Sequence, residues 1–494
     1  MRRAELKLIY QELRRRRAQQ GLKDPVLPTL PNRKRIYQTV EEEQAERQRV
    51  VEEKTKVFRS LLPELLKGLA RIKDPRDPKR TKHKLTVILL YGLLIFVLQI
   101  SSRREIAREM ALPELWENLN TIFPELQSLP HHDTLNRLLS RLEGEDLEAV
   151  LIGTVQKLLR NKKLQHWLRD RRYLIAIDGT QKFSRDYPWT EELNRRAAGK
   201  NGEEVQYYVY VVEANLVLPG GGSIPLAGEF LQFTGEELDN NKQDCELKAF
   251  YRLAGRLKQY FPRLPITVLL DGLYANGPVM ELCRKYRWEF MIVLQDKALP
   301  SVWKEGRALF KLNPENSRRQ TWGNRRQYFW WTNDIDYTYG PNDRKRQTIH
   351  LVVCEEEWEE VDPKTGKIIK KTSRHAWIAS QPLSHINVHR RCNLTARYRW
   401  SIENGILVEK RHGYEYQHCF SYNWHAMQGF HYLMRLGHLF NILAHKSIYL
   451  AGIVCELGTR GLIKFFRETL KGPWLDIERI KTLVAAGKFQ LRLE

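Results

Sequence analysis

The sequence has 494 residues, 42% of them hydrophobic, which suffices for sizeable cores in about two to four domains and excludes an intrinsically disordered protein. Lys and Arg number 82 against 59 Asp and Glu, so the formal net charge at pH 7 is +23. This excess of cations favours a polyanionic partner, with nucleic acid as the first candidate and an acidic membrane surface as the second.

The six cysteines are scattered, with no C-x-x-C pair and no Cys/His spacing of the zinc-site kind. This distribution argues against a disulfide scaffold and against a structural zinc site, and a reducing, intracellular setting fits it best. The amino-terminal stretch MRRAELKLIYQELRRRR is charged and helix-periodic, with no apolar region behind it. It is therefore not typical of a secretory signal.

The first third of the sequence is predicted to be helical. Residues 1–60 form a charged segment that breaks at DPVLPTLPNRKR, and we expect this segment to be exposed and mobile. In residues 61–165 the helical periodicity continues, and residues 85–100 carry no charge. That run is just short of the ~18 to 20 residues of a membrane span. A buried core helix is the favoured interpretation, with a spanning or surface-lying helix as alternatives.

Two short helices are predicted within residues 61–165, in SRREIAREMALPEL and PHHDTLNRLLSRLEGEDL. In the second, Asp133 is the expected N-cap, and four leucines share one face: Leu135, Leu138, Leu139 and Leu142. The pair fits a DNA-reading helix-turn-helix, but short helical hairpins are common. Residues 61–165 are accordingly a possible DNA-binding domain.

Strands are predicted from Tyr173 onward, in RYLIAIDGT, VQYYVYVVEANLVLP and SIPLAGEFLQF, with LPGGGS as a loop or hairpin turn. A helix, the buried strand of PITVLLDGLY, a second helix and the strand EFMIVL follow. This succession predicts an α/β core with parallel strands, beginning in residues 166–296. Residues 297–380 alternate polar with aromatic or β-branched residues and predict an inserted β-rich module, and residues 381–494 are predicted to be mostly helical.

Two acids, Asp178 in LIAIDGT and Asp271 in TVLLDGLY, end apolar strands in the same way. A buried strand that ends in Asp-Gly places the carboxylate at the edge where open α/β sheets have their sites, although Asp-Gly is also a common turn dipeptide. A third acid, Glu403, is four residues after Arg399 and seven before Lys410. On an α-helix these spacings would put all three side chains on one face. An i,i+4 ion pair on a surface helix is the alternative explanation.

Three carboxylates brought together would repel one another unless a hard divalent cation neutralises them. Mg²⁺ is held by a few carboxylates while it keeps water and substrate phosphate as further ligands. Two such ions can activate the attacking oxygen and stabilise the leaving oxygen in phosphoryl transfer. With a net charge of +23, this constellation points to nucleic-acid phosphodiesters as the substrate.

The stretches LIAIDGT, TVLLDGLY and RYRWSIENGILVEK resemble the three acidic motifs of bacterial insertion-sequence DDE transposases, in the group with a β-strand insertion domain before the Glu. The signature of that group is Tyr, two residues, Arg, three residues, Glu, six residues, Lys. Arg399, Glu403 and Lys410 match it, whereas Ala396 stands at the Tyr position. The resemblance extends to DPRDPKRTKHKLTVILL, PHHDTLNRLL, GTQKFS and KQDCELKAFYRL.

The resemblance implies a ribonuclease H-like catalytic core. Asp178, Asp271 and Glu403 would be the catalytic ligands of two Mg²⁺ ions, for which Mn²⁺ would substitute. Arg399 and Lys410 would contact phosphates near the scissile bond. A Trp of the β-rich module would stack on a base flipped from the element's end, and we choose Trp330 or Trp331 because RRQYFWW places basic residues beside them.

The implied function is a DNA transposase that binds the ends of an insertion sequence and catalyses Mg-dependent strand cleavage and strand transfer. Its partner would be double-stranded DNA, as element ends and target, bound by a homodimer, with no membrane partner. It would work in the bacterial cytoplasm, associated with the nucleoid. The alternative is a catalytically inactive, transposase-derived DNA-binding protein.

Other polar residues near these motifs have simpler explanations. Asp244 and Glu246 in KQDCE would lie at a helix N-terminus, where acids are favoured, although a contact with the site or substrate is the alternative. Several histidines near Glu403 lack regular ligand spacing and are assigned structural or phosphate-facing roles. They are His412, His418, His425, His431 and His438.

Overall fold

The computed structural model has a mixed α/β fold, in which the described residues contain ten strands in a mixed sheet and helices toward both termini. The chain divides into two compact units. The first unit comprises residues 1–29, 169–176 and 263–400, and the second comprises residues 30–168, 177–262 and 401–494. The structure describes residues 3–24, 30, 37–199, 204–232, 244–362 and 364–493.

Three strands run parallel, as the sequence predicts, and their paired residues lie in the first unit. They are β1 (Tyr173–Arg185), β5 (Ile266–Leu270) and β6 (Glu289–Val293), and α10 (Gly277–Lys285) lies in the crossover from β5 to β6. All five residues of β5 are buried, because a parallel strand is covered on both faces and the apolar run ITVLL suits both. The backbone position of Asp271, which directly follows β5, is therefore fixed by a buried strand.

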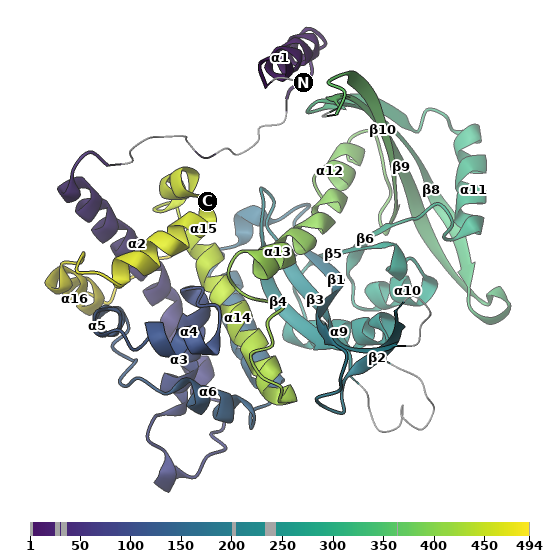
Figure 1. Ribbon diagram of the computed structural model, residues 1–494. Helices are drawn as coiled ribbons and strands as arrows, with labels where there is room; N and C mark the ends of the chain where they lie inside the picture. Colours follow the sequence, from purple (N-terminus) through teal and green to yellow (C-terminus); the bar gives the residue numbers. More distant parts are fainter. Residues whose placement is uncertain are drawn as a thin grey trace. The chain divides into compact units, whose positions relative to one another are not determined.

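Four antiparallel strands of the first unit provide the strand content predicted for residues 297–380. In order from β6 they are β10 (Ile368–Ala379), β9 (Lys345–Val361), β8 (Arg325–Tyr339) and β7 (Ser317–Trp322). Helix α11 (Pro300–Leu312) packs on β8, as Figure 1 shows. Phe310 of α11 stacks on Trp330 of β8 with the ring centroids 5.0 Å apart. The module thus has its own aromatic core.

Helical segments begin and end the first unit. Helix α1 (Arg3–Gln19) is mostly exposed, but it buries Leu13 and contacts β9. The backbone N–H of Lys23 donates to the carbonyl of Gly323 at 3.0 Å. At its other end the unit closes with α12 (Val388–Asn393) and the 3-10 turn η5 (Ala396–Arg399).

The strands of the second unit are antiparallel. They are β2 (Asn194–Ala198), β3 (Glu204–Val217) and β4 (Ser223–Phe230), and α9 (Glu246–Tyr260) packs on β3 and β4. The stretch LPGGGS is the hairpin turn between β3 and β4, as predicted. Gly220, Gly221 and Gly222 adopt φ of 103°, 114° and 93°, a region in which only glycine is free of steric cost.

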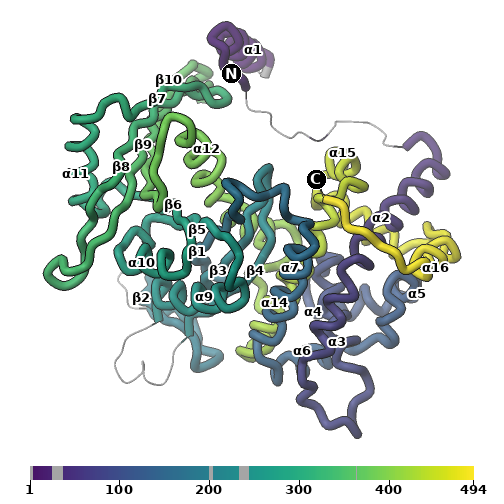
Figure 2. Tube along the Cα trace, turned by 180° about the vertical axis from the view of Figure 1, so that it is seen from behind, coloured from purple at the N-terminus to yellow at the C-terminus, as the bar shows by residue number. Residues whose placement is uncertain are grey.

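The apolar stretch near residue 90 is a core helix, which confirms the favoured interpretation. Helix α3 (Leu85–Val97) has twelve buried residues out of 13. It packs against α14 (Trp424–His445) and α2 (Val40–Leu69), and Figures 1 and 2 show α3 beside α14 from both sides. Among the described helices, none is long and apolar enough to cross a membrane.

The expected exposure of residues 1–60 is wrong for the part that forms α2. Val50, Val51 and Phe58 are fully buried, because this helix continues past residue 60 and packs one face against α7, α14 and α15. The remaining helices of the second unit are α4 (Arg103–Glu109), α5 (Pro113–Ile122), α6 (His132–Leu139), α7 (Gly144–Arg160), α13 (Trp400–Arg411), α15 (Ala451–Leu470) and α16 (Ile477–Ala485).

Helix α6 has the predicted buried face, but not the predicted cap. Leu135, Leu138 and Leu139 are completely buried. The N-cap is His131, whose side chain accepts the backbone N–H of Asp133, so Asp133 lies inside the first turn. Helix α5 separates α4 from α6 in the chain, so the predicted pair is not joined by a short turn. DNA reading by this region stays a prediction.

Close packing of α3 on α14 requires a glycine in α14. A Cβ on Gly437 would lie 2.6 Å from the Cβ of Phe96 and 3.0 Å from its carbonyl carbon. We expect Gly437→Ala to lower the free energy of unfolding by about 1 to 3 kcal/mol, because the helices would have to separate. Gly153→Ala in α7, which meets nothing within 4 Å, should instead raise it by about 0.5 to 1 kcal/mol. Urea unfolding measures both values, and equal shifts would contradict this packing.

Candidate active site

Asp178 lies on β1, just after the buried run Ile175–Ile177, and is half-buried in the second unit. Its neighbour Gly179 is needed for close packing, since a Cβ there would lie 2.4 Å from a carboxylate oxygen of Glu246. Glu246 is in the first turn of α9, as predicted, and accepts a hydrogen bond from the Tyr210 hydroxyl at 2.8 Å. A second carboxylate therefore lies beside the Asp-Gly pair of β1, a proximity that helix capping alone does not explain.

Asp271 directly follows β5 in the first unit and is half-buried. Its Oδ1 accepts the backbone N–H of Leu273 at 2.9 Å and so caps the short 3-10 turn η3 (Gly272–Tyr274). The turn interpretation of Asp-Gly is thus correct locally. It leaves the other carboxylate oxygen of Asp271 out of the cap and does not exclude a catalytic role.

Glu403 is half-buried in the first turn of α13. Lys410 is seven residues further along this helix, so the two side chains differ by only about 20° around the helix axis. The Lys410 ammonium donates a hydrogen bond to Thr180 Oγ1 at 2.6 Å, and Thr180 is two residues after Asp178. The second unit therefore brings the Lys410 end of α13 to the stretch of β1 that carries Asp178.

The pKa of Lys410 is lowered by its burial beside β1. Burial lowers the pKa of its ammonium, and the negative charges of Glu213, Asp178 and Glu409 oppose that shift. The net direction is downward, so burial outweighs the three carboxylates. Lys410 is thus an incompletely solvated cation beside Asp178, a setting in which an anionic phosphate would be an effective partner.

Arg399 is not part of the helix that carries Glu403. The prediction that Arg399, Glu403 and Lys410 share one face of a single α-helix is therefore wrong for Arg399. It is the last residue of η5, and α13 begins at Trp400. The predicted face assumed a constant rotation of 100° per residue, and the change from 3-10 to α geometry breaks this regularity. Arg399 is only 7% exposed, with its guanidinium 4.7 Å from the ring centroid of Trp400. Ala396, at the position of the family's Tyr, is also buried.

Trp330 and Trp331 are packing residues, and the structure does not favour them for base stacking. They are 8% and 1% exposed, because Trp330 stacks on Phe310 and Trp331 meets His385 edge-on. The half-buried tryptophans of the module are Trp322 and Trp358, each with a guanidinium over its ring: Arg397 at 5.0 Å and Arg325 at 4.2 Å.

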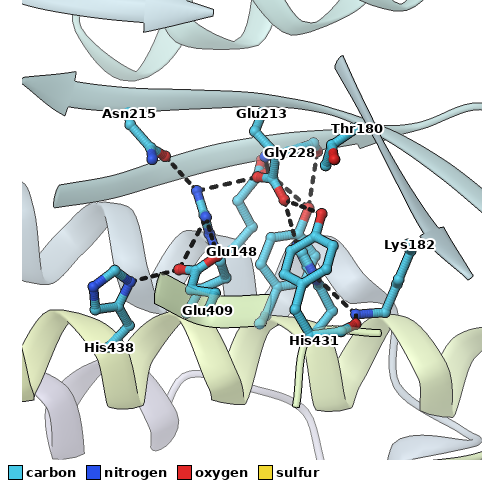
Figure 3. Close-up of polar contacts among 12 residues, drawn as sticks. Glu148, Thr180, Lys182, Glu213, Asn215, Gly228, Glu409, His431 and His438 are labelled. Carbon is cyan, nitrogen blue, oxygen red and sulfur yellow. Dashed lines mark hydrogen bonds and ion pairs between the residues drawn. The ribbon is translucent and has the colours of Figure 1, made fainter. Parts of the chain in front are cut away.

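A buried ionic network holds the back of α13. Arg435 of α14 donates to both carboxylate oxygens of Glu409, at 2.9 and 3.1 Å, and lies 3.1 Å from Glu213 of β3. These three side chains are at most 1% exposed. Figure 3 shows Glu409, Glu213 and Asn215 around this network, with His438 hydrogen-bonded to Glu409. The network fastens the helix of Glu403 to its neighbours.

The two buried carboxylates differ in ionisation. Burial raises the pKa of both, but the charges of Arg435 and His438 outweigh it at Glu409, whose pKa is lowered. At Glu213 burial prevails and the pKa is raised. Glu409 is therefore the firmly charged partner of Arg435. Sequence reasoning assigned structural roles to His431 and His438 but missed this network, because its members lie on three elements far apart in the chain.

A second network, within the first unit, holds the segment that leads into α13. Arg397 of η5 donates to Glu356 of β9 at 2.5 Å, and its Nε donates to Asn393 of α12 at 3.0 Å. Gln327 of β8 also donates to Asn393, at 3.1 Å. Burial alone would raise the pKa of Glu356, but the His375 hydrogen bond and the Arg397 charge lower it to about 2. The β-rich module is thus bound to η5 by a permanently charged pair.

One group of side chains outside the candidate active site could hold a metal ion. Where the structure describes the chain, one grouping of three His, Cys, Asp or Glu side chains has its ligand atoms within 4.8 Å of one another. It consists of His131, His132 and Asp133, at the start of α6. His131 is exposed, and no such cluster was predicted from the sequence.

The helical region from the end of α2 to α7 is similar to a known family. Residues 66–154 match the family model described as DDE_Tnp_1-associated. The match points to the DDE-type transposases. Two of the stretches that carry the sequence resemblance, DPRDPKRTKHKLTVILL and PHHDTLNRLL, lie inside the matched residues. No curated protein matches the chain.

Removal of Arg435 should destabilise the protein strongly. We expect Arg435→Met to lower the free energy of unfolding at pH 7 by about 3 to 5 kcal/mol, because Glu409 and Glu213 would remain buried without their cation. Arg435 lowers the pKa of Glu409 below its ordinary 4.5, so its contribution is present above that pH and is lost as the pH falls. The penalty of the substitution should therefore shrink below about pH 4.5.

Urea unfolding of both proteins across that pH range measures the effect. The matched control is Arg411→Met, which removes the same charge from the exposed last turn of α13 and should change stability by less than about 0.5 kcal/mol. A penalty for Arg435→Met that grows toward acid pH would contradict the assigned charge states.

Proposed function

We propose that the protein is a DDE-type DNA transposase of an insertion sequence, which binds the element's ends and catalyses Mg-dependent strand cleavage and strand transfer. The observation that carries this proposal is the register of two parallel strands. Ala176 of β1 pairs with Leu269 of β5, and Asp178 and Asp271 each follow two residues later. Adjacent strands are about 4.8 Å apart, and residues of equal parity face the same side. The register thus supports a shared site for both carboxylates, on a core we propose to be ribonuclease H-like.

Glu403 would complete the site. Its support comes from the Lys410–Thr180 hydrogen bond, which ties α13 to β1 two residues past Asp178. Half-buried carboxylates are the hard oxygen donors that Mg²⁺ prefers, and they leave positions for water and phosphate. Two Mg²⁺ ions, or Mn²⁺ in their place, would supply activation of the attacking oxygen and stabilisation of the leaving oxygen.

The basic residues around this site would hold the DNA. Lys410 is the proposed phosphate contact at the carboxyl end of α13. Arg399, the second one, is 7% exposed and would have to turn outward to reach a phosphate. In the β-rich module Trp322 and Trp358 are better placed than Trp330 and Trp331 for stacking on a base, because they are only half-buried.

The reaction that fits this arrangement has two steps. Hydrolysis of a phosphodiester at the element's end would free a 3′-hydroxyl, and that hydroxyl would attack a phosphodiester of the target, displacing its 3′-oxygen. The carboxylates would hold the cations against which the reacting phosphate is placed, and the net charge of +23 favours a DNA partner. Joining of two ends to one target requires at least a homodimer. The bacterial cytoplasm, at the nucleoid, is the proposed location.

Cleavage of an end-containing duplex tests this function. With Mg²⁺, the protein should nick an oligonucleotide duplex that carries the element's terminal sequence. Asp178→Ala and Glu403→Gln should cut at least about 100-fold more slowly, because each metal ligand supports several kcal/mol of transition-state stabilisation. Asp186→Asn, which changes an exposed acid shortly after β1, is the matched control and should cut at the parent's rate.

Duplex binding, measured by mobility shift, separates the possible failures. The variants should bind the duplex as the parent does. If they also cut as fast as the parent, the catalytic assignment is wrong. If the parent binds the duplex and cuts with neither Mg²⁺ nor Mn²⁺, the protein is an inactive transposase-derived DNA-binding protein.

A further inference from the structure

A cavity of about 400 Å³ lies within the second unit, behind the helix of Glu403. Its walls come from α13, α14, α15 and the β3–β4 turn. Helix α13 lines it with Asn404, Gly405 and Val408, which lie roughly 100° to 160° around the helix from Glu403. The volume is in the range of small-molecule sites, about 300 to 1,000 Å³. The proposed DNA site and this cavity therefore use different faces of one helix.

The charged side chains that line this cavity are both cationic. Among the described lining residues there is no Asp or Glu, whereas Lys446 and Arg460 contribute cations. Arg460 is exposed and Lys446 half-buried, so the positive charge lies toward the mouth. A carboxylate-free cavity with two cations at its entrance selects against cationic ligands and favours an anion.

The imidazoles of the cavity have unused hydrogen-bonding atoms. His412 Nδ1 and His445 Nε2 are both buried, and no residue that the structure describes hydrogen-bonds to either atom. Buried polar atoms without a partner cost roughly 1 to 3 kcal/mol each. Burial lowers the pKa of His445 well below its ordinary value, so this imidazole is neutral and offers one donor and one acceptor. A ligand with polar ring or hydroxyl atoms would satisfy both histidines.

The rest of the cavity wall is apolar. Val408, Ile442, Val454 and Ile463 line it, and at Gly220–Gly222 the backbone itself forms part of the wall without side chains. Apolar walls between imidazoles suit a flat, aromatic body. The side chains that line the cavity are thus cationic at the mouth. Further inside they are apolar, with a few hydrogen-bonding atoms.

We propose that this cavity is a binding site for a small aromatic anion of the class of a nucleoside monophosphate. The phosphate would pair with Lys446 and Arg460, and the planar base would lie between the apolar side chains and hydrogen-bond to His412 or His445. The proposal needs no DNA cleavage and is independent of the proposed transposase activity. An occupied cavity would also stabilise α13 from behind.

The two exposed cysteines provide the test. Cys455 lines the cavity, and Cys245 lies at the start of α9, outside it. The full-length protein is alkylated with iodoacetamide, with and without AMP, and modification of each cysteine is followed by mass spectrometry. Saturating AMP should slow modification of Cys455 at least tenfold and leave the rate at Cys245 unchanged. Equal protection of both cysteines, or none, would overturn the proposal.

Variants and ligand fragments locate the bound groups. Lys446→Gln and Arg460→Gln should each raise the AMP concentration needed for half-protection at least tenfold, because each removes one phosphate partner. Lys464→Gln is the matched control, since Lys464 is exposed on α15 but outside the cavity lining, and it should change nothing. Adenosine and inorganic phosphate should each protect Cys455 far less than AMP. Protection by phosphate alone at the same concentration would refute an aromatic ligand.

Discussion

The ion pair between Arg435 and Glu409 is the interaction on which the candidate active site depends. Glu409 is six residues after Glu403 on α13, and its two oxygens are held by a completely buried guanidinium. Such a pair adds little net stability compared with apolar packing, but it is costly to break, so it fixes one arrangement of the elements that share it. The position of Glu403 is therefore set from behind by α14 and β3, while its own side chain is only half-buried.

Each unit holds a segment next to α13 by contacts of its own. Within the first unit, Glu356 of the β-rich module holds Arg397, three residues before α13 begins. Within the second unit, Lys410 hydrogen-bonds to β1 beyond Asp178. Within the first unit, the inserted module therefore holds the segment that leads into the helix of Glu403.

Local sequence predicted the elements well and their assembly poorly. The apolar run around residues 85–100 and the strand ITVLL were predicted correctly, because burial on all sides leaves an unmistakable local signature. The regular spacing of Arg399, Glu403 and Lys410 led to the wrong prediction of one shared helical face. Arg399 belongs to the 3-10 turn η5, so its side chain does not follow the rotation of α13. The burial of Trp330 and Trp331 was not foreseen, because neighbouring arginines do not reveal which face of β8 is covered. The family match at residues 66–154 supports a DDE-type transposase, but it does not reach these residues.

The central claim is that Asp178, Asp271 and Glu403 share two divalent cations. The most direct measurement is anomalous X-ray scattering from a crystal of the full-length protein grown with Mn²⁺ and an element-end duplex. The account predicts two manganese peaks among these three carboxylates, about 3.5 to 4 Å apart as in two-metal sites. Peaks confined to His131, His132 and Asp133, or none near Glu403, would contradict it.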